Sequence, residues 1–192
     1  MIQTERFEKV EVDSVESLRT WLTLNHQQTE SVWLVTYKKS VPEKYISVQE
    51  VLDELLCFGW IDGIRRKLDD TRTMQLIAPR KVQHWTQTYK KRVERLIAEQ
   101  RMHASGLASM QASMDVGQWN VMERVDRLEL PTDLLEALEL NAAALAFFQA
   151  INPSSKRFVL RWLHLAKTAK TRSRRIAHIV EISAKGEKLK GS

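Results

Sequence analysis

The sequence contains a single cysteine, Cys57, among its 192 residues. One cysteine cannot form a disulfide within the chain, so packing and polar contacts must hold the fold together. The sequence also has no apolar run of about 18 residues, the length that a membrane-spanning helix needs. Five charged residues fall between Met1 and Val12, where a signal peptide would have an apolar core. We therefore expect a cytoplasmic protein that is not inserted in a membrane.

Glycine and histidine are also scarce, with six and five residues respectively. None of the glycines has the spacing of a GxGxxG motif or of a P-loop, the two common backbone cradles for phosphate. The histidines show no HxxxH spacing, and the lone cysteine excludes CxxC. The sequence thus predicts no metal site and no cofactor.

The net charge of +6 is distributed in blocks of alternating sign. Residues 1–59 carry −4, 60–101 carry +6, 102–150 carry −5 and 151–192 carry +9. Such alternation lets basic segments pair with acidic ones, whereas a nucleic-acid-binding protein more often gathers its positive charge on one face. No aromatic residues interleave with the basic clusters at 90–92 and 172–175. We therefore expect no nucleic-acid partner, although a regulator that binds nucleic acid through basic helices stays open as an alternative.

Capping residues and apolar periodicity mark the expected helices and strands. Ser47 and Glu50 form a capping box that begins a helix, and Gly59 is placed to end that helix in a left-handed conformation. Thr86 is expected to cap a basic helix. Strands are expected at 7–12, 31–37, 60–66 and 71–78, and further helices begin near 15, 104, 132, 142, 153 and 171, whereas 117–131 is the least periodic stretch.

These elements predict an α+β fold, in which a small and mainly antiparallel sheet is covered by helices and the C-terminal half is helical. We expect a single domain over residues 1–185. Its sheet-containing part would be 1–101, with the helical part 102–185 packed on it. Residues 186–192 would form a flexible tail.

The expected hairpin at residues 60–78 has two faces of different composition. If Asp69 and Asp70 form its turn, the strand period of two places Trp60, Asp62 and Arg66 on the same face. That face also receives Thr73, Gln75 and Ile77 from the returning strand, and its mixture of polar and apolar residues is typical of a pocket. The opposite face, which would be mostly core, holds Ile61, Gly63, Arg65, Met74, Leu76 and Ala78.

Three segments of the sequence resemble the YdeI/OmpD-associated family, also called bacteriocin-protection proteins. They are CFGWIDG at 57–63, the APR…W…RVERLI run at 78–97, and SKRFVLRWLHLAKTAKTRSRRIAHIVE at 155–181. The resemblance implies a small bacterial cytoplasmic protein connected with tolerance of antimicrobial agents that act on the envelope, without an established chemical activity. The sequence departs from the family pattern at 86–89, where Thr-Gln-Thr-Tyr stands in place of Ser-Lys-x-Asn.

Asp62 and Arg66 are the most suggestive pair, because residues four apart on a strand point the same way, about 13 Å apart, and can flank a ligand between them. The guanidinium fork of an arginine suits a carboxylate or a phosphate. The alternative for both residues is an ordinary surface ion pair. The predicted ligand-binding set is Trp60, Asp62, Arg66, Thr73, Gln75, Arg80 and Trp85, although core packing is the favoured explanation for each of the two tryptophans. Cys57 is interpreted as a buried, unreactive thiol.

The leading hypothesis is a stress-tolerance protein that binds a small anionic ligand, or an acidic group of a protein partner, at this face. An enzyme also stays open, because Asp62 could serve as a general base if its surroundings raised its pKa. The sequence identifies neither the ligand, nor a catalytic residue, nor the oligomeric state.

Overall fold

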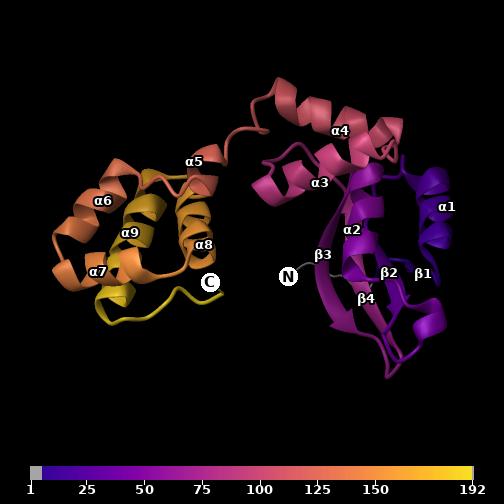
Figure 1. Cartoon of the computed structure of the whole chain (residues 1–192), viewed down its shortest axis with the longest axis horizontal. Helices are drawn as coiled ribbons and strands as arrows, with labels where there is room; N and C mark the ends of the chain where they lie inside the picture. The colour runs from indigo at the N-terminus through magenta and orange to yellow at the C-terminus, as the bar shows by residue number, and fades with distance from the viewer. Residues whose placement is uncertain (1–5, 192) are drawn as a thin grey trace. The chain divides into compact units, whose positions relative to one another are not determined.

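The computed structural model describes residues 6–191, and the chain divides into two compact units, Met1–Asn120 and Val121–Ser192 (Figure 1). Each unit is described by itself. The predictions for residues 1–5 lie outside the described residues.

The first unit contains a four-stranded sheet in the order β1-β2-β4-β3. Strand β1 pairs with β2 in parallel, while β2 with β4 and β3 with β4 are antiparallel. β3 therefore lies at one edge. The elements of this unit are β1 (Lys9–Glu11), α1 (Val15–Asn25), β2 (Val32–Tyr37), a short 3-10 helix (Pro42–Lys44), α2 (Val48–Cys57), β3 (Trp60–Lys67), β4 (Arg72–Pro79), α3 (Gln87–Ala98) and α4 (Ala104–Asp115).

Local capping explains where the helices of this unit begin and end. The Ser47 hydroxyl accepts from the Glu50 amide while the Glu50 carboxylate accepts from the Ser47 amide, so both ends of the predicted capping box are present. Gly59 follows α2 with a φ of +74°, a value at which a side chain would be strained. Thr86 caps α3 as predicted, and Ser14 caps α1.

Helices α1 and α2 pack on the same face of the sheet (Figure 1). Leu18 and Leu22 of α1 and Leu55 of α2 are fully buried there, against Leu34 and Ile77 of the sheet. Burial of this apolar surface is the main stabilising term for the unit. It also fixes which side of β3 and β4 faces the helices.

The second unit is helical throughout its regular structure. Its core cluster includes Leu134, Phe148, Leu160 and Ile179, which come from four different helices. Asn141 and Asn152 cap the two helices that were expected to begin near 142 and 153, and Pro153 follows Asn152 in the first helical turn. The elements are α5 (Glu123–Asp126), α6 (Thr132–Glu139), α7 (Ala142–Ala150), α8 (Pro153–His164) and α9 (Ala169–Ala184).

The predicted fold class, α+β with a helical C-terminal half, is confirmed. The sheet is mixed, since β1 and β2 are parallel. The least periodic stretch, 117–131, contains the short helix α5. The helix expected near 132 begins at Thr132, and Pro131 occupies its capping position without a side-chain hydrogen bond. The single-domain organisation stays a prediction.

Candidate functional site

A β-bulge in β3 separates residues that the sequence pattern placed together. Asp62 pairs with Ile77, but the register shifts before Arg65, which pairs with Gln75. An extra residue in a strand turns all later side chains to the opposite face. Arg66 therefore does not share a face with Asp62, and this prediction is wrong. The Arg66 guanidinium instead lies on the other face, 5.3 Å from the centre of the Trp33 ring.

The assignment of the core face was also wrong. Trp60 and Ile77 are fully buried and belong to the cluster beneath α1 and α2, so the helix-covered face is the one that carries Asp62. Ile61 and Leu76, which were expected in the core, are half-buried on the opposite face. The pairing of β2 with β4 explains this assignment. Leu34 of β2 packs against the helices and pairs with Gln75 of β4, so Gln75 and Ile77, two residues further along β4, face the helices as well.

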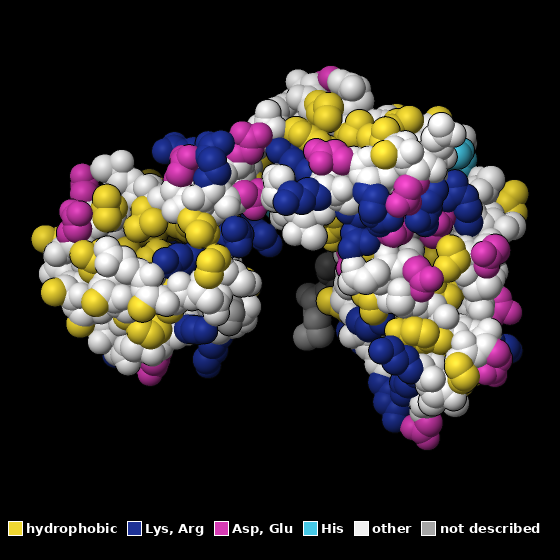
Figure 2. All heavy atoms as spheres, viewed as in Figure 1, with side chains coloured by type: hydrophobic (Ala, Val, Ile, Leu, Met, Phe, Trp, Pro, Cys, Tyr) yellow, Lys and Arg dark blue, Asp and Glu magenta, His cyan; other side chains and the backbone are white. Residues whose placement is uncertain are grey.

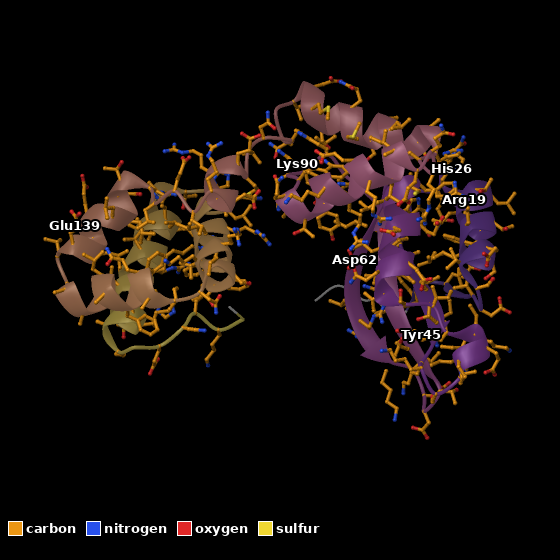
Figure 3. The ribbon with its side chains drawn as sticks, in the orientation of Figure 1. Arg19, His26, Tyr45, Asp62, Lys90 and Glu139 are labelled. Carbon is orange, nitrogen blue, oxygen red and sulfur yellow. The ribbon has the colours of Figure 1, made fainter. Side chains whose placement is uncertain are left out.

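Asp62 lies on the edge strand near α3, where both of its carboxylate oxygens accept hydrogen bonds (Figure 3). The Tyr89 hydroxyl donates to Oδ1 at 2.9 Å, and Gln75 Nε2 donates to Oδ2 at 3.2 Å. Arg65, in the place predicted for Arg66, donates from Nη2 to Gln75 Oε1 at 2.6 Å. Burial and the neighbouring Asp62 raise the pKa of Tyr89 to about 12, so its hydroxyl remains a neutral donor at neutral pH.

Arg80 is the most unusual charge in this region, because it is buried and lacks a carboxylate within ion-pair distance among the described residues. Its guanidinium lies 4.0 Å from the centre of the Trp85 ring and 5.4 Å from that of Tyr89. Nη2 donates to the His84 carbonyl at 3.0 Å, whereas Nε and Nη1 are buried without a hydrogen-bond partner. Burial lowers the pKa of Arg80, and Tyr89 and Asp62 act in the opposite direction.

We call Asp62, Gln75, Arg80, Trp85 and Tyr89 the Arg80 cluster. Four of its members were predicted from the sequence, and Tyr89 was not, although it is a position at which the chain departs from the family pattern. The other predicted site residues lie apart: Trp60 packs edge-on against Trp21 with ring centres 5.5 Å apart, Thr73 lies 3.4 Å from the Thr36 hydroxyl, and Arg66 is on the other face.

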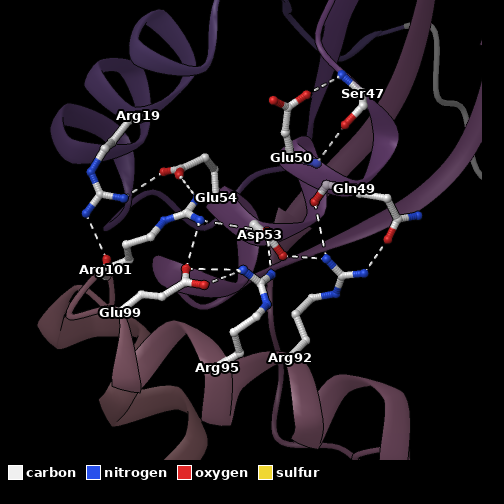
Figure 4. Close-up of polar contacts among 10 residues, drawn as sticks. All are labelled: Arg19, Ser47, Gln49, Glu50, Asp53, Glu54, Arg92, Arg95, Glu99 and Arg101. Atoms are coloured by element: carbon white, nitrogen blue, oxygen red, sulfur yellow. Dashed lines mark hydrogen bonds and ion pairs between the residues drawn. The ribbon is translucent and has the colours of Figure 1, made fainter.

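A second polar group, the α2 acid network, was missed by sequence analysis (Figure 4). Glu54, whose side chain is 2% exposed, pairs with Arg19 of α1 and with Arg101, which follows α3. Asp53 pairs with Arg92 and Arg95 of α3. Figure 2 shows acidic and basic side chains mixed where α3 meets α2. Because every carboxylate here is paired, we interpret the network as a clamp between helices and not as a binding site.

Cys57 and the possible metal ligands among the described residues give no evidence of a further functional site. Cys57 is a buried free thiol whose pKa is raised to about 11 by burial, as expected for an unreactive cysteine. Within residues 6–191 no group of three or more His, Cys, Asp or Glu side chains is arranged to hold a metal ion. None of the helices described is both long enough and apolar enough to cross a bilayer.

Comparison with protein families assigns both parts of the chain. Residues 10–109, just over half of the chain, match a domain of unknown function, DUF8412, and the chain therefore belongs to that family. Residues 127–186 match the family described as bacteriocin-protection, YdeI or OmpD-associated. The predicted resemblance to this family is thus confirmed over residues 127–186, which contain the third of the three segments that suggested it; the other two segments lie within the DUF8412 match. Neither the curated proteins nor the solved structures gave a match.

Proposed function

We propose that the protein binds a small anionic ligand, a carboxylate or a phosphate, at the Arg80 cluster. The observation that supports this is the buried Arg80 guanidinium with two unpartnered nitrogens. An unpaired charge away from water is costly, and N–H groups that are buried without an acceptor add to the cost. A bound anion would neutralise the charge and accept from these groups, which makes binding favourable.

The aromatic rings restrict the ligand to a small one. Trp85 is 1% exposed and packs against Arg80, so an anion can reach the guanidinium only beside its rings. The segment 81–86, which joins β4 to α3 without helix or strand, must shift to admit it. Asp62 lies close enough to influence Arg80 but is held by Tyr89 and Gln75. It would therefore discriminate by repulsion against anions of high charge.

The cellular role that fits the family match is tolerance of envelope-active agents by a cytoplasmic protein. The matched family is described by its printed name as bacteriocin-protection. In this proposal the bound anion is the signal or substrate through which the protein acts.

The binding proposal is tested by thermal unfolding with sodium phosphate and sodium acetate, against sodium chloride at equal ionic strength. We expect one of the two anions to raise the melting temperature of the wild type, and Arg80→Lys to lose most of this rise, because lysine keeps the charge but not the planar fork. Arg66→Ala is the matched control, since it removes a cation from the other face. An equal rise in all three proteins would reveal general salt stabilisation and would reject the site.

The cellular proposal needs a separate measurement. Cells that lack the gene would be complemented with the wild type, Arg80→Lys or Arg66→Ala and challenged with a bacteriocin. We expect survival to be restored by the wild type and by Arg66→Ala but not by Arg80→Lys. If the wild type gives no protection, the stress role is wrong even where anion binding holds.

A further inference from the structure

A groove of about 490 Å³ lies between α8 and α9 in the second unit. This volume is within the range of small-molecule sites. The lining residues are Trp162 from α8 and, from α9, Arg174, Arg175, Ala177, His178 and Glu181. The groove is distinct from the Arg80 cluster, which belongs to the first unit.

Two aromatic rings form its wall. The rings of Trp162 and His178 have centres 6.2 Å apart and planes inclined at 68°. The Arg175 guanidinium lies 4.7 Å from the centre of the Trp162 ring, and Nη1 donates to the Trp162 carbonyl. Arg175 thereby ties α9 to α8 and fixes the indole. Trp162 is half-buried and His178 is exposed, so both rings offer surface to a planar ligand.

The charge of the groove is graded along α9. Arg174 is exposed and has no ion pair among the described residues, so its guanidinium is available to an anion. Ala177, with only a methyl group, leaves room between Arg174 and Glu181. The Glu181 carboxylate is occupied by Lys185, whose Nζ lies 2.6 Å from Oε1. The end of the groove at Arg174 is therefore the positive one.

The surrounding charge has the same sign. Residues 121–192 contain 13 Lys and Arg against 8 Asp and Glu, which gives +5 of the +6 carried by the whole chain. The sequence argued against nucleic acid because no aromatic residue accompanies the basic cluster at 172–175. The structure corrects that premise: Trp162 is distant in sequence, but α8 brings it to Arg175 and His178.

We propose that this groove binds a nucleotide unit, with the phosphate at Arg174 and the base against Trp162 and His178. Stacking on aromatic side chains beside a basic surface is the usual way in which proteins hold unpaired bases. The same chemistry is offered by a free mononucleotide and by single-stranded nucleic acid.

The test uses the full chain with two probes that share a base, dAMP and an eight-nucleotide deoxyadenosine strand. Binding is measured by calorimetry for dAMP and by fluorescence anisotropy for the labelled strand. We expect Arg174→Ala to weaken binding about tenfold or more, since it removes a charge-assisted contact. Trp162→Phe and His178→Ala should each weaken it by about fivefold or more through lost stacking.

Arg124→Ala is the control, because it also removes one positive charge from the second unit but its side chain, 77% exposed, lies outside the groove. We expect less than about a threefold effect on binding of either probe. Arg80→Lys should leave binding unchanged, which separates this site from the Arg80 cluster. Equal binding of the two probes per nucleotide identifies a free nucleotide as the ligand, and tight binding of the strand alone identifies a single strand.

Two results would overturn the proposal. One is that Arg124→Ala weakens binding as much as Arg174→Ala while His178→Ala and Trp162→Phe do not, which would mean that only net charge matters. The other is that neither probe binds to the wild type at physiological salt.

Discussion

Tyr89 donates a hydrogen bond of 2.9 Å from its hydroxyl to Oδ1 of Asp62, and this contact joins α3 to the edge strand β3. An edge strand has hydrogen bonds to a neighbouring strand on one side only, so side-chain bonds to a covering helix help to hold it in place. The same contact fixes the ring that lies beside Arg80. The hydrogen bond between Tyr89 and Asp62 thus stabilises both the edge strand β3 and the Arg80 cluster.

We expect Tyr89→Phe to lower the free energy of unfolding by about 1–2 kcal/mol, since a half-buried hydrogen bond to a carboxylate is lost. Chemical denaturation at neutral pH measures this. Tyr37→Phe is the matched control, because Tyr37 donates to Glu11 at an exposed position, and it should cost less. Equal losses for the two variants would mean that burial adds nothing to the Asp62 contact.

The same hydrogen bond predicts a pH dependence at the alkaline end. The pKa of Tyr89 is raised from its ordinary value of 10.0 to about 12, so the folded state holds this proton more tightly than the unfolded state does. Its contribution to stability is complete below pH 10 and is lost as the pH rises towards 12. The stability difference between the wild type and Tyr89→Phe should therefore shrink across this window. A stability difference that stays constant from pH 10 to pH 12 would contradict the raised pKa of Tyr89.

The α2 acid network gives a second stability prediction. Glu54→Gln leaves Arg19 and Arg101 facing a neutral amide in a nearly closed site, and we expect a loss of about 2–4 kcal/mol. Glu99→Gln is the control, because Glu99 pairs with Arg95 and Arg101 from an exposed position, and its loss should stay below about 1 kcal/mol. Urea titrations of the two variants compare them directly. A small loss of stability in Glu54→Gln would show that water reaches the ion pairs of Glu54.

Local features of this fold were readable from the sequence, and the reason is visible at Ser47. Its capping box with Glu50 lies within one helical turn, so it depends on nothing distant in the chain. The left-handed conformation of Gly59 is equally local. By contrast, the partners of Glu54 are 35 and 47 residues away, and no periodicity reports them. The α2 acid network was missed for that reason.

The candidate site was half predicted for a related reason. Strand parity correctly placed Asp62 with Gln75, but the bulge then moved Arg66 to the other face. Gly63 carried a signal that could have warned of it, because an isolated glycine in a strand often marks a bulge. Tyr89 joins the site only through the packing of α3 on β3, a tertiary relationship that spans 27 residues.

Gly106 provides a test of helix packing. A Cβ atom there would lie 2.2 Å from the Cys57 carbonyl oxygen, so α4 can approach the end of α2 only without a side chain. We expect Gly106→Ala to cost about 3 kcal/mol or more, as forced overpacking does. Gly117→Ala is the control: it has a φ of +74° but nothing within 4 Å of its Cβ, so only backbone strain of about 1 kcal/mol applies. Similar melting temperatures for the two variants would contradict this packing.

The last prediction concerns the organisation of the chain. Deleting residues 153–192 removes α8 and α9, and with them Leu160, Leu163, Ile176 and Ile179 from the core cluster of the second unit. Helices α5–α7 are too short to be stable alone, so we expect them to unfold. The single-domain hypothesis further expects the first unit to lose cooperative unfolding.

Circular dichroism melts of the truncated and full-length proteins separate these two expectations. Loss of the helical signal of α5–α7 follows in either case, because their apolar faces have no covering. A truncated protein that still melts cooperatively near the full-length temperature would contradict the single-domain hypothesis, since the cluster around Leu34 and Leu55 would then be stable without α8 and α9. A truncated protein with no cooperative transition would support it, because the first unit would then depend on the second for its stability.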